Sequence, residues 1–158
     1  MFKLRKWWLI FTGVILFFGT FSAQAESGVA TEGNCNKFAN STQPFVLELK
    51  PGMELVESVA ECVKQAKIIR AGIFGVGDLV DPTVLYFNLE TKHYHYRTFV
   101  GTYEVSSMTG EIDTLATVPT LNRNIHVSLA GPNYKLVGGH LYSGWVGIIF
   151  NVIIVPLQ

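Results

Sequence analysis

The sequence has no excess of charge of either sign, few cysteines and no familiar catalytic motif. Its 12 basic residues balance 12 acidic ones over 158 residues, and only two cysteines are present. No segment after residue 25 concentrates lysine and arginine, although a phosphate-binding face needs such a concentration. There is no G-x-S-x-G elbow, P-loop, H-E-x-x-H helix or dinucleotide fingerprint. These absences oppose nucleic-acid binding and leave no complete catalytic constellation.

The N-terminus has the pattern of an export signal. Three cations within residues 1–6 precede an apolar run over residues 7–21, and Ala23 and Ala25 supply the small residues that a signal peptidase needs. The run is shorter than the roughly 20 apolar residues of a spanning helix. We therefore favour a cleaved signal peptide at residues 1–25 over a retained anchor, and an exported, periplasmic or secreted, mature chain without a membrane span. Removing the three cations leaves 12 − 3 = 9 basic against 12 acidic residues, a net charge of −3.

The mature chain of 158 − 25 = 133 residues is long enough for one domain and too short for two. Residues 26–43 are polar and aperiodic, which predicts a loose N-terminal tail before a folded domain at residues 44–157. Apolar residues at helical spacing predict one principal helix over residues 54–67.

Strands are predicted by alternation and by β-branched and aromatic residues. They cover residues 45–50, 68–77, 83–89, 93–100, 103–112, 125–130 and 146–155. One helix among many strands predicts an α+β fold with a mainly antiparallel sheet, because parallel pairs need long crossovers. The last strand carries no charge, so we expect it to be central or buried at a subunit contact.

Cys35 and Cys62 are an even pair in a chain that we expect to reach an oxidising compartment, where such a pair suggests a disulfide. One buried and one exposed thiol are the alternative, because geometry decides whether two cysteines can be bridged. We predict the bridge, which would hold the polar tail against the helix.

The four histidines of the mature chain form two pairs. His93 and His95 share one strand face with Arg97, and a solvent-exposed face explains this pattern better than a chelating pair does. His126 and His140 have the more suggestive context. Asn124 lies two residues before His126, so on a strand both side chains point the same way.

Two glycines, Gly138 and Gly139, directly precede His140. A backbone without side chains lets a ligand or another strand approach closely. The surroundings of His140 are therefore a candidate binding site.

The run N-I-H-V-S-L-A-G at residues 124–131, followed by V-G-G-H-L-Y-S-G at 137–144, resembles the H-x-H-x-x-L…G-G-H-L signature of the plants and prokaryotes conserved domain, the PPC domain. Three upstream segments resemble that family in the same order. They are F-V-L-E-L-K-P-G-M-E-L at 45–55, I-I-R-A-G-I-F-G-V-G at 68–77 and Y-E-V-S-S-M-T-G-E-I at 103–112. The resemblance implies an antiparallel sheet flanked by a helix, assembled as a homotrimer.

The same resemblance implies several functions. In plants the domain follows AT-hooks, which this sequence lacks, and mediates protein contacts; stand-alone microbial members have been described as DNA-binding, and some carry a metal on a histidine triad. The triad maps onto Asn124, His126 and His140, so an amide replaces the first ligand, and Asn151 stands where the family tends to have glutamate. Zinc prefers imidazole, thiolate and carboxylate donors, so zinc or another divalent metal would be held weakly here.

Our leading hypothesis is a non-catalytic, exported homotrimer that binds a small ligand or a protein partner. Its site would comprise Asn124, His126 and His140, with Glu104 as the nearest acid. Alternatively, the two histidines hydrogen-bond backbone at a subunit contact without any ligand. A metal-dependent hydrolytic enzyme using His126, His140 and Glu104 is the second function, and DNA binding is a third, disfavoured by charge and export.

Overall fold

A computed structural model of the chain describes residues 29–31, 34–117 and 122–157, so the expected signal peptide lies outside the described residues. The elements follow in the order β1 (Val29–Thr31), η1 (Cys35–Phe38), β2 (Phe45–Leu49), α1 (Leu55–Gln65), β3 (Arg70–Asn88), β4 (His93–Thr98), β5 (Thr102–Asp113), β6 (Arg123–Ala130) and β7 (Leu136–Leu157). No helix within these ranges is long and apolar enough to cross a membrane.

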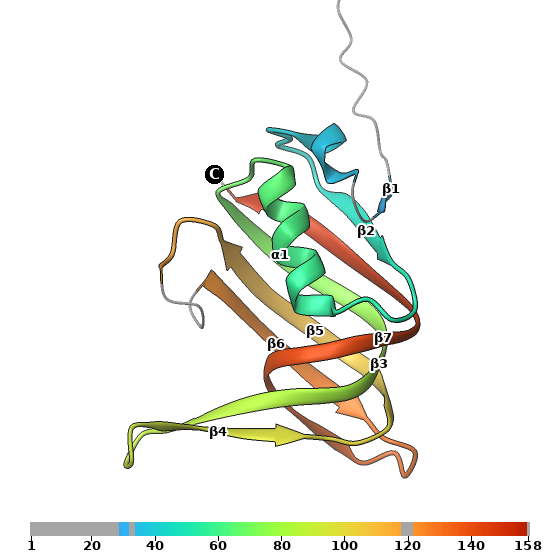
Figure 1. Cartoon of the computed structure of the whole chain (residues 1–158), viewed down its shortest axis with the longest axis vertical. Helices are drawn as coiled ribbons and strands as arrows, with labels where there is room; N and C mark the ends of the chain where they lie inside the picture. The colour runs from blue at the N-terminus through green and yellow to red at the C-terminus, as the bar shows by residue number, and fades with distance from the viewer. Residues whose placement is uncertain (1–28, 32–33, 118–121, 158) are drawn as a thin grey trace, which may run out of the picture.

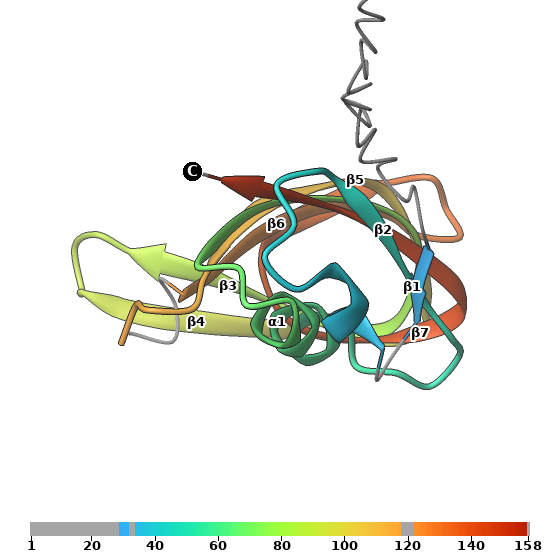
Figure 2. The ribbon, with the colours of Figure 1, turned by 90° about the horizontal axis from the view of Figure 1, so that it is seen from above.

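The described strands form one sheet in the order β1-β2-β7-β6-β5-β3-β4 (Figure 1). β3 also pairs with β7, so the sheet curves back on itself, as the view from above shows (Figure 2). The pairing of β1 with β2 is parallel and the others are antiparallel. The predicted fold class is confirmed, and the uncharged C-terminal strand is central, between β2, β3 and β6.

β3 and β7 are longer than the sequence predicts. β3 joins the two strands expected at 68–77 and 83–89, and β7 begins at Leu136, ten residues before the expected start at residue 146. Asp81-Pro82 and the glycines of β7 are typical of turns, so the local sequence predicts that the strands end there. In the structure both strands instead pass through register shifts and resume pairing with each other.

Helix α1 covers one face of the sheet (Figures 1 and 2). Leu55, Val59 and Val63 lie on its apolar stripe and are fully buried. Across from them the sheet contributes buried side chains such as Ile73 and Ile154. Burial of this stripe stabilises the helix where the spacing of the sequence predicts it.

Glu54 connects the start of α1 to β7. Its carboxylate accepts a hydrogen bond from the backbone N–H of Glu57 at 2.6 Å, which caps the helix, and another from the N–H of Gly144 at 2.9 Å. The corresponding bond from a Ser, Thr, Asp or Asn cap contributes about 1 kcal/mol. One side chain therefore fixes both the first turn of the helix and its position against β7.

The disulfide between Cys35 and Cys62 is present, which confirms the predicted bridge. It joins η1 to α1, and the two Cα atoms are 5.3 Å apart. Both cysteines are buried.

The expectation of a loose tail at residues 26–43 needs correction. β1 pairs with β2, and Cys35 and Phe38 are buried. The ring of Phe38 stacks on that of Phe45 with 4.2 Å between centroids. Cys35 and Phe38 pack this segment onto the domain, so the packed part of the chain begins before residue 44. The segment is otherwise polar, which is why its composition predicts a loose tail.

We expect loss of the disulfide to lower the free energy of unfolding by about 3 kcal/mol, because it closes a loop in the unfolded chain. The two cysteines are 27 positions apart in the sequence. The measurement compares urea denaturation of the Cys35→Ser/Cys62→Ser variant with that of the wild type, oxidised and reduced. Reduced wild type should match the variant. Equal unfolding midpoints for the variant and the oxidised wild type would contradict the expectation.

Candidate functional site

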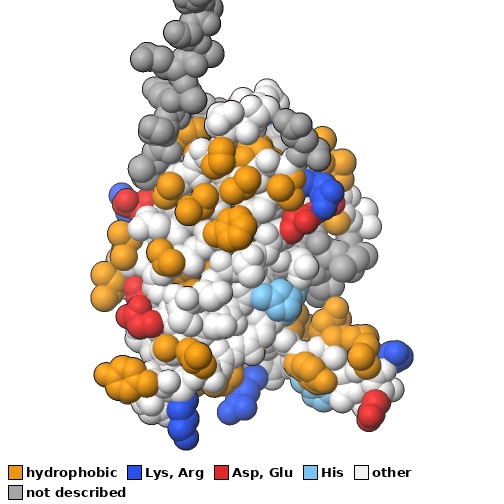
Figure 3. Space-filling view, turned by 180° about the vertical axis from the view of Figure 1, so that it is seen from behind, with side chains coloured by type: hydrophobic (Ala, Val, Ile, Leu, Met, Phe, Trp, Pro, Cys, Tyr) orange, Lys and Arg blue, Asp and Glu red, His pale blue; other side chains and the backbone are white. Residues whose placement is uncertain are grey.

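His126 on β6 and His140 on β7 are direct cross-strand partners. Their ring centroids are 5.2 Å apart with an interplanar angle of 79°, so the imidazoles meet edge to face. Ile125 and Val127, on either side of His126, are buried, whereas His126 is exposed. The pair therefore lies on the sheet face away from α1, where histidine side chains are visible from behind (Figure 3).

The two glycines before His140 serve strand packing. A Cβ at Gly138 would overlap the carbonyl oxygen of Val127, and a Cβ at Gly139 would lie 3.1 Å from the carbonyl oxygen of Leu85. The sequence predicts that these glycines let either a ligand or another strand approach closely. The structure shows the close approach of neighbouring strands. The close packing of β7 against β6 brings the imidazoles into contact.

Asn124 is exposed on β6, two residues before His126 and opposite Glu111 of β5. Glu104, in contrast, is opposite Ala130, four residues along β6 from His126, or about 13 Å. The structure does not bring Glu104 to the histidines, contrary to expectation. The pairing register of β5 with β6 determines where Glu104 lies, and a local sequence pattern does not reveal that register.

Glu111 is the acid that the register places beside Asn124, and the sequence did not single it out. Its carboxylate accepts a hydrogen bond from Nε of Arg70 at 2.8 Å. The carboxylate raises the pKa of the Arg70 guanidinium, first through this hydrogen bond and then through its charge. Glu111 is thus engaged in an ion pair on the sheet surface.

The residues present do not fit a three-donor metal centre. Within the described ranges no group of three or more His, Cys, Asp or Glu side chains is arranged to hold a metal ion. His126 and His140 supply two imidazoles, and Asn124 supplies only an amide, which is a poor zinc donor.

His140 is half-buried, and its pKa is lowered from the ordinary histidine value, first by burial and second by the nearby charge of His126. The folded state thus disfavours the protonated imidazole. Because the folded pKa lies below the unfolded one, protonation costs stability, and this cost grows as pH falls below about 6.5. At neutral pH His140 is a neutral hydrogen-bonding group.

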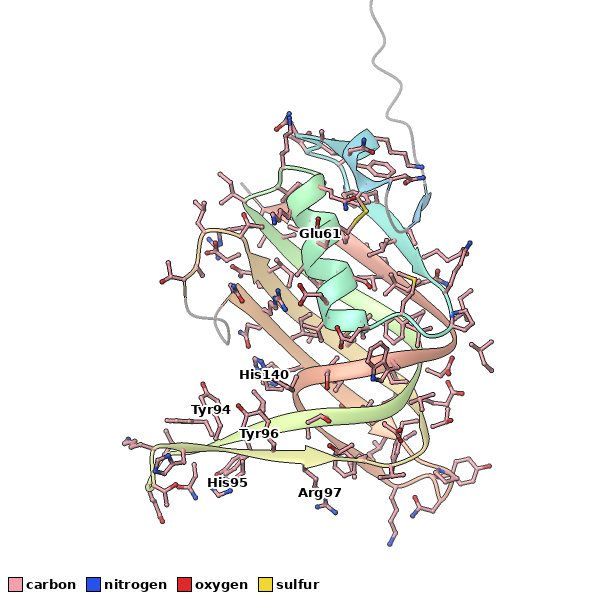
Figure 4. The ribbon with its side chains drawn as sticks, viewed as in Figure 1. Glu61, Tyr94, His95, Tyr96, Arg97 and His140 are labelled. Carbon is pink, nitrogen blue, oxygen red and sulfur yellow. A yellow bond between two sulfur atoms is a disulfide. The ribbon has the colours of Figure 1, made fainter. Side chains whose placement is uncertain are left out.

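The β3–β4 hairpin projects from the body of the domain (Figures 1 and 2). All residues of β4 are exposed. Tyr94 and Tyr96 point toward His140, whereas His95 and Arg97 point to the opposite side of the hairpin (Figure 4). The interpretation of His95 and Arg97 as a solvent-exposed strand face is confirmed.

Replacing His126 with glutamine should raise the pKa of His140, because the variant removes a neighbouring cation while keeping a polar side chain of similar bulk. NMR titration of the imidazole resonances measures this pKa. The matched control is His95→Gln on the far side of the hairpin, which should leave the His140 pKa unchanged. An unaltered His140 pKa in His126→Gln would show that the charge of His126 does not contribute to lowering the His140 pKa.

Comparison with known proteins relates this arrangement to solved structures. A plant- and prokaryote-conserved (PPC) protein from Pyrococcus horikoshii is 28% identical, with a TM-score of 0.67 over 73% of this chain and 79% of that chain. A metal-containing protein from Archaeoglobus fulgidus is also 28% identical, with a TM-score of 0.66 over 73% and 80%. Alpha-acetolactate decarboxylase from Bacillus subtilis shares the fold alone, at 12% identity and a TM-score of 0.50 over 72% and 52%.

No curated protein sequence matches the chain. The family model of the Plants and Prokaryotes Conserved (PCC) domain, by contrast, matches residues 36–158. This match begins before residue 44, in agreement with the packing of η1 onto the domain. It covers most of the chain and includes both histidines of the pair. The chain therefore belongs to the Plants and Prokaryotes Conserved domain family, whose name is abbreviated PCC or PPC.

Proposed function

We propose that the mature chain is an exported, non-catalytic homotrimer that binds a small ligand or a protein partner through the surface around His126 and His140. One observation carries this proposal. The sheet face opposite α1 is apolar and exposed, and the paired histidines lie on that same face.

The apolar face is built by alternation along β3 and β7. Phe74, Val76 and Ile153 are 48%, 62% and 46% exposed, whereas Ile73 and Ile154 next to them are buried under α1. Seen from behind, apolar side chains gather on this face above the histidines (Figure 3). An antiparallel sheet that faced water here would carry polar residues instead. A contiguous apolar surface of this kind supports association with further copies of the chain.

A hollow of about 710 Å³ lies in the apolar part of this face, and neither His126 nor His140 lines it, so it supports the binding of a small ligand beside the histidine pair. Its size falls within the range of ligand pockets in proteins. Apolar side chains and a few polar ones line it, including Glu48, Ser107 and Asn151. Glu48 and Asn151 are cross-strand partners, so their polar groups lie together at one side of the hollow. A neighbouring subunit over the face would shield this hollow from water.

Charge and the disulfide support export and oppose DNA binding. The expected mature chain has a net charge of −3, and DNA binding needs a concentrated basic surface. The bridge between Cys35 and Cys62 is typical of a protein that resides in an oxidising compartment. The hydrolytic alternative has no observation in its favour, because the register keeps Glu104 away from the histidine pair.

Light scattering at micromolar concentration should give a mass three times that of the mature chain. Val76→Glu should reduce this mass to that of a monomer, because it would bury like charges in the contact without partners. The matched control is Val100→Glu, since Val100 is 83% exposed in the turn between β4 and β5. It should remain trimeric. A wild-type monomer across the micromolar range, or a trimer that survives Val76→Glu, would refute this assembly.

A further inference from the structure

We propose that aromatic rings on the projecting hairpin extend the His126/His140 surface into a docking strip for a proline-rich segment in the polyproline II conformation. The members of this ring strip are His126, His140, Tyr142, Tyr96, Tyr94 and Phe87. The inference rests on the proposed function, because it names the class of partner that the same surface binds.

The strip runs across four neighbouring strands. His126 on β6 is the partner of His140 on β7, which is in turn the partner of Leu85 on β3, and Leu85 is the partner of Tyr96 on β4. Residues opposite each other on neighbouring strands share a face. Leu85 is 3% exposed and therefore forms the floor between the imidazole pair and Tyr96. Strands are about 4.8 Å apart, so the row is about 14 Å long.

Contacts between rings hold the strip in place. Tyr96 meets Tyr142 edge to face with 5.2 Å between centroids, and Phe87 meets Tyr94 at 4.9 Å. Even so, the four rings remain between 38% and 58% exposed. Because the rings already restrict one another, a partner that binds them loses less side-chain entropy than it would on mobile residues. The strip is thus both exposed and preorganised.

The polar groups of the strip are tyrosine hydroxyls and imidazoles, which can donate hydrogen bonds. The strip contains no carboxylate and no permanently charged cation. Tyr96, Tyr142, His126 and His140 each carry at least one donor. Among the described residues, none of these four side chains makes a hydrogen bond to another protein group, whereas Tyr94 already has an interaction partner. A polyproline II segment presents apolar rings and solvated carbonyl acceptors, and proline has no N–H. The donors and rings of the strip complement these groups.

A neutral glycan is the competing occupant, since sugar rings also stack on aromatic side chains. Its hydroxyl groups donate hydrogen bonds as well as accept them. Carboxylates and amides are strong acceptors for such hydroxyl groups, and the ring strip contains neither; its acceptors are tyrosine hydroxyls and imidazole nitrogens, which also serve as its donors. The composition of the strip therefore favours the polyproline II segment.

The dimensions agree with this choice. A polyproline II helix rises about 3.1 Å per residue, so one turn of three residues spans about 9 Å. His140 and Tyr96 are separated by two strand spacings, or about 10 Å. Prolines three residues apart can therefore contact the imidazole pair and the tyrosine pair in the same orientation. The complete row accommodates about five residues.

Calorimetric titration of the mature protein with decaproline tests the proposal, with maltohexaose as the glycan probe and a ten-residue Gly-Ser peptide as the flexible control. Decaproline should bind, and the other two should not. Tyr96→Ala and Tyr142→Ala should each weaken decaproline binding at least about tenfold, as expected for central aromatic contacts. Tyr96→Phe keeps the ring and should weaken it less.

The matched control is Tyr86→Ala on the opposite face of the hairpin, where Tyr86 is 67% exposed and is the partner of His95. It should change decaproline affinity less than twofold. Circular dichroism melts establish that each variant is folded. Decaproline binding that persists in a Tyr96→Ala/Tyr142→Ala double variant would overturn the proposal, and so would an absence of decaproline binding or binding of maltohexaose alone. Light scattering of the same samples shows separately whether the trimer of the proposed function exists.

Discussion

Asp78 lies buried on β3, and its carboxylate accepts hydrogen bonds from the backbone N–H groups of Ile148 and Ile149 on β7. A Cβ at Gly147 would overlap this carboxylate, so the glycine leaves room for it. Near this contact β7 changes neighbours. Residues after it pair with β2, and residues before it pair with β6. The site depends on this change, because His140 meets His126 only on the portion of β7 that has reached β6.

The course of β7 also explains why the two faces of one sheet differ. Alternation sends Val152 and Ile154 into the core beneath α1 and sends Ile153 outward beside Phe74. The outward side chains form an apolar surface that the helix does not cover. Farther along the same strand, His140 and Tyr142 face outward toward the hairpin. Self-association and partner binding thus use adjacent parts of one face in our account, while α1 and the disulfide stabilise the other.

Local patterns predict those features whose cause is local. The apolar stripe of α1 follows from the helical spacing of its residues. The shared face of Asn124 and His126 follows from strand alternation. The disulfide could be predicted because the chain has only two cysteines, which can pair in one way.

The remaining features depend on contacts between distant segments. β3 continues past Asp81-Pro82 because β7 pairs with it on both sides of the bend. Glu104 is displaced from the histidines by the register of β5 against β6, which includes a bulge between Val105 and Ser107. The contact of Tyr96 with Tyr142 joins two strands far apart in the sequence. None of these features has a signature within one window of the chain.

The central claim is that the face opposite α1 buries its apolar part in self-association and leaves its ring strip accessible. Hydroxyl-radical footprinting of the mature protein over a dilution series measures both parts in one sample. Our account predicts that Phe74, Val76 and Ile153 become protected as the concentration rises, while Tyr96 and Tyr142 remain reactive throughout. Unchanged reactivity of the three apolar residues, or protection of the two tyrosines in their place, would contradict it.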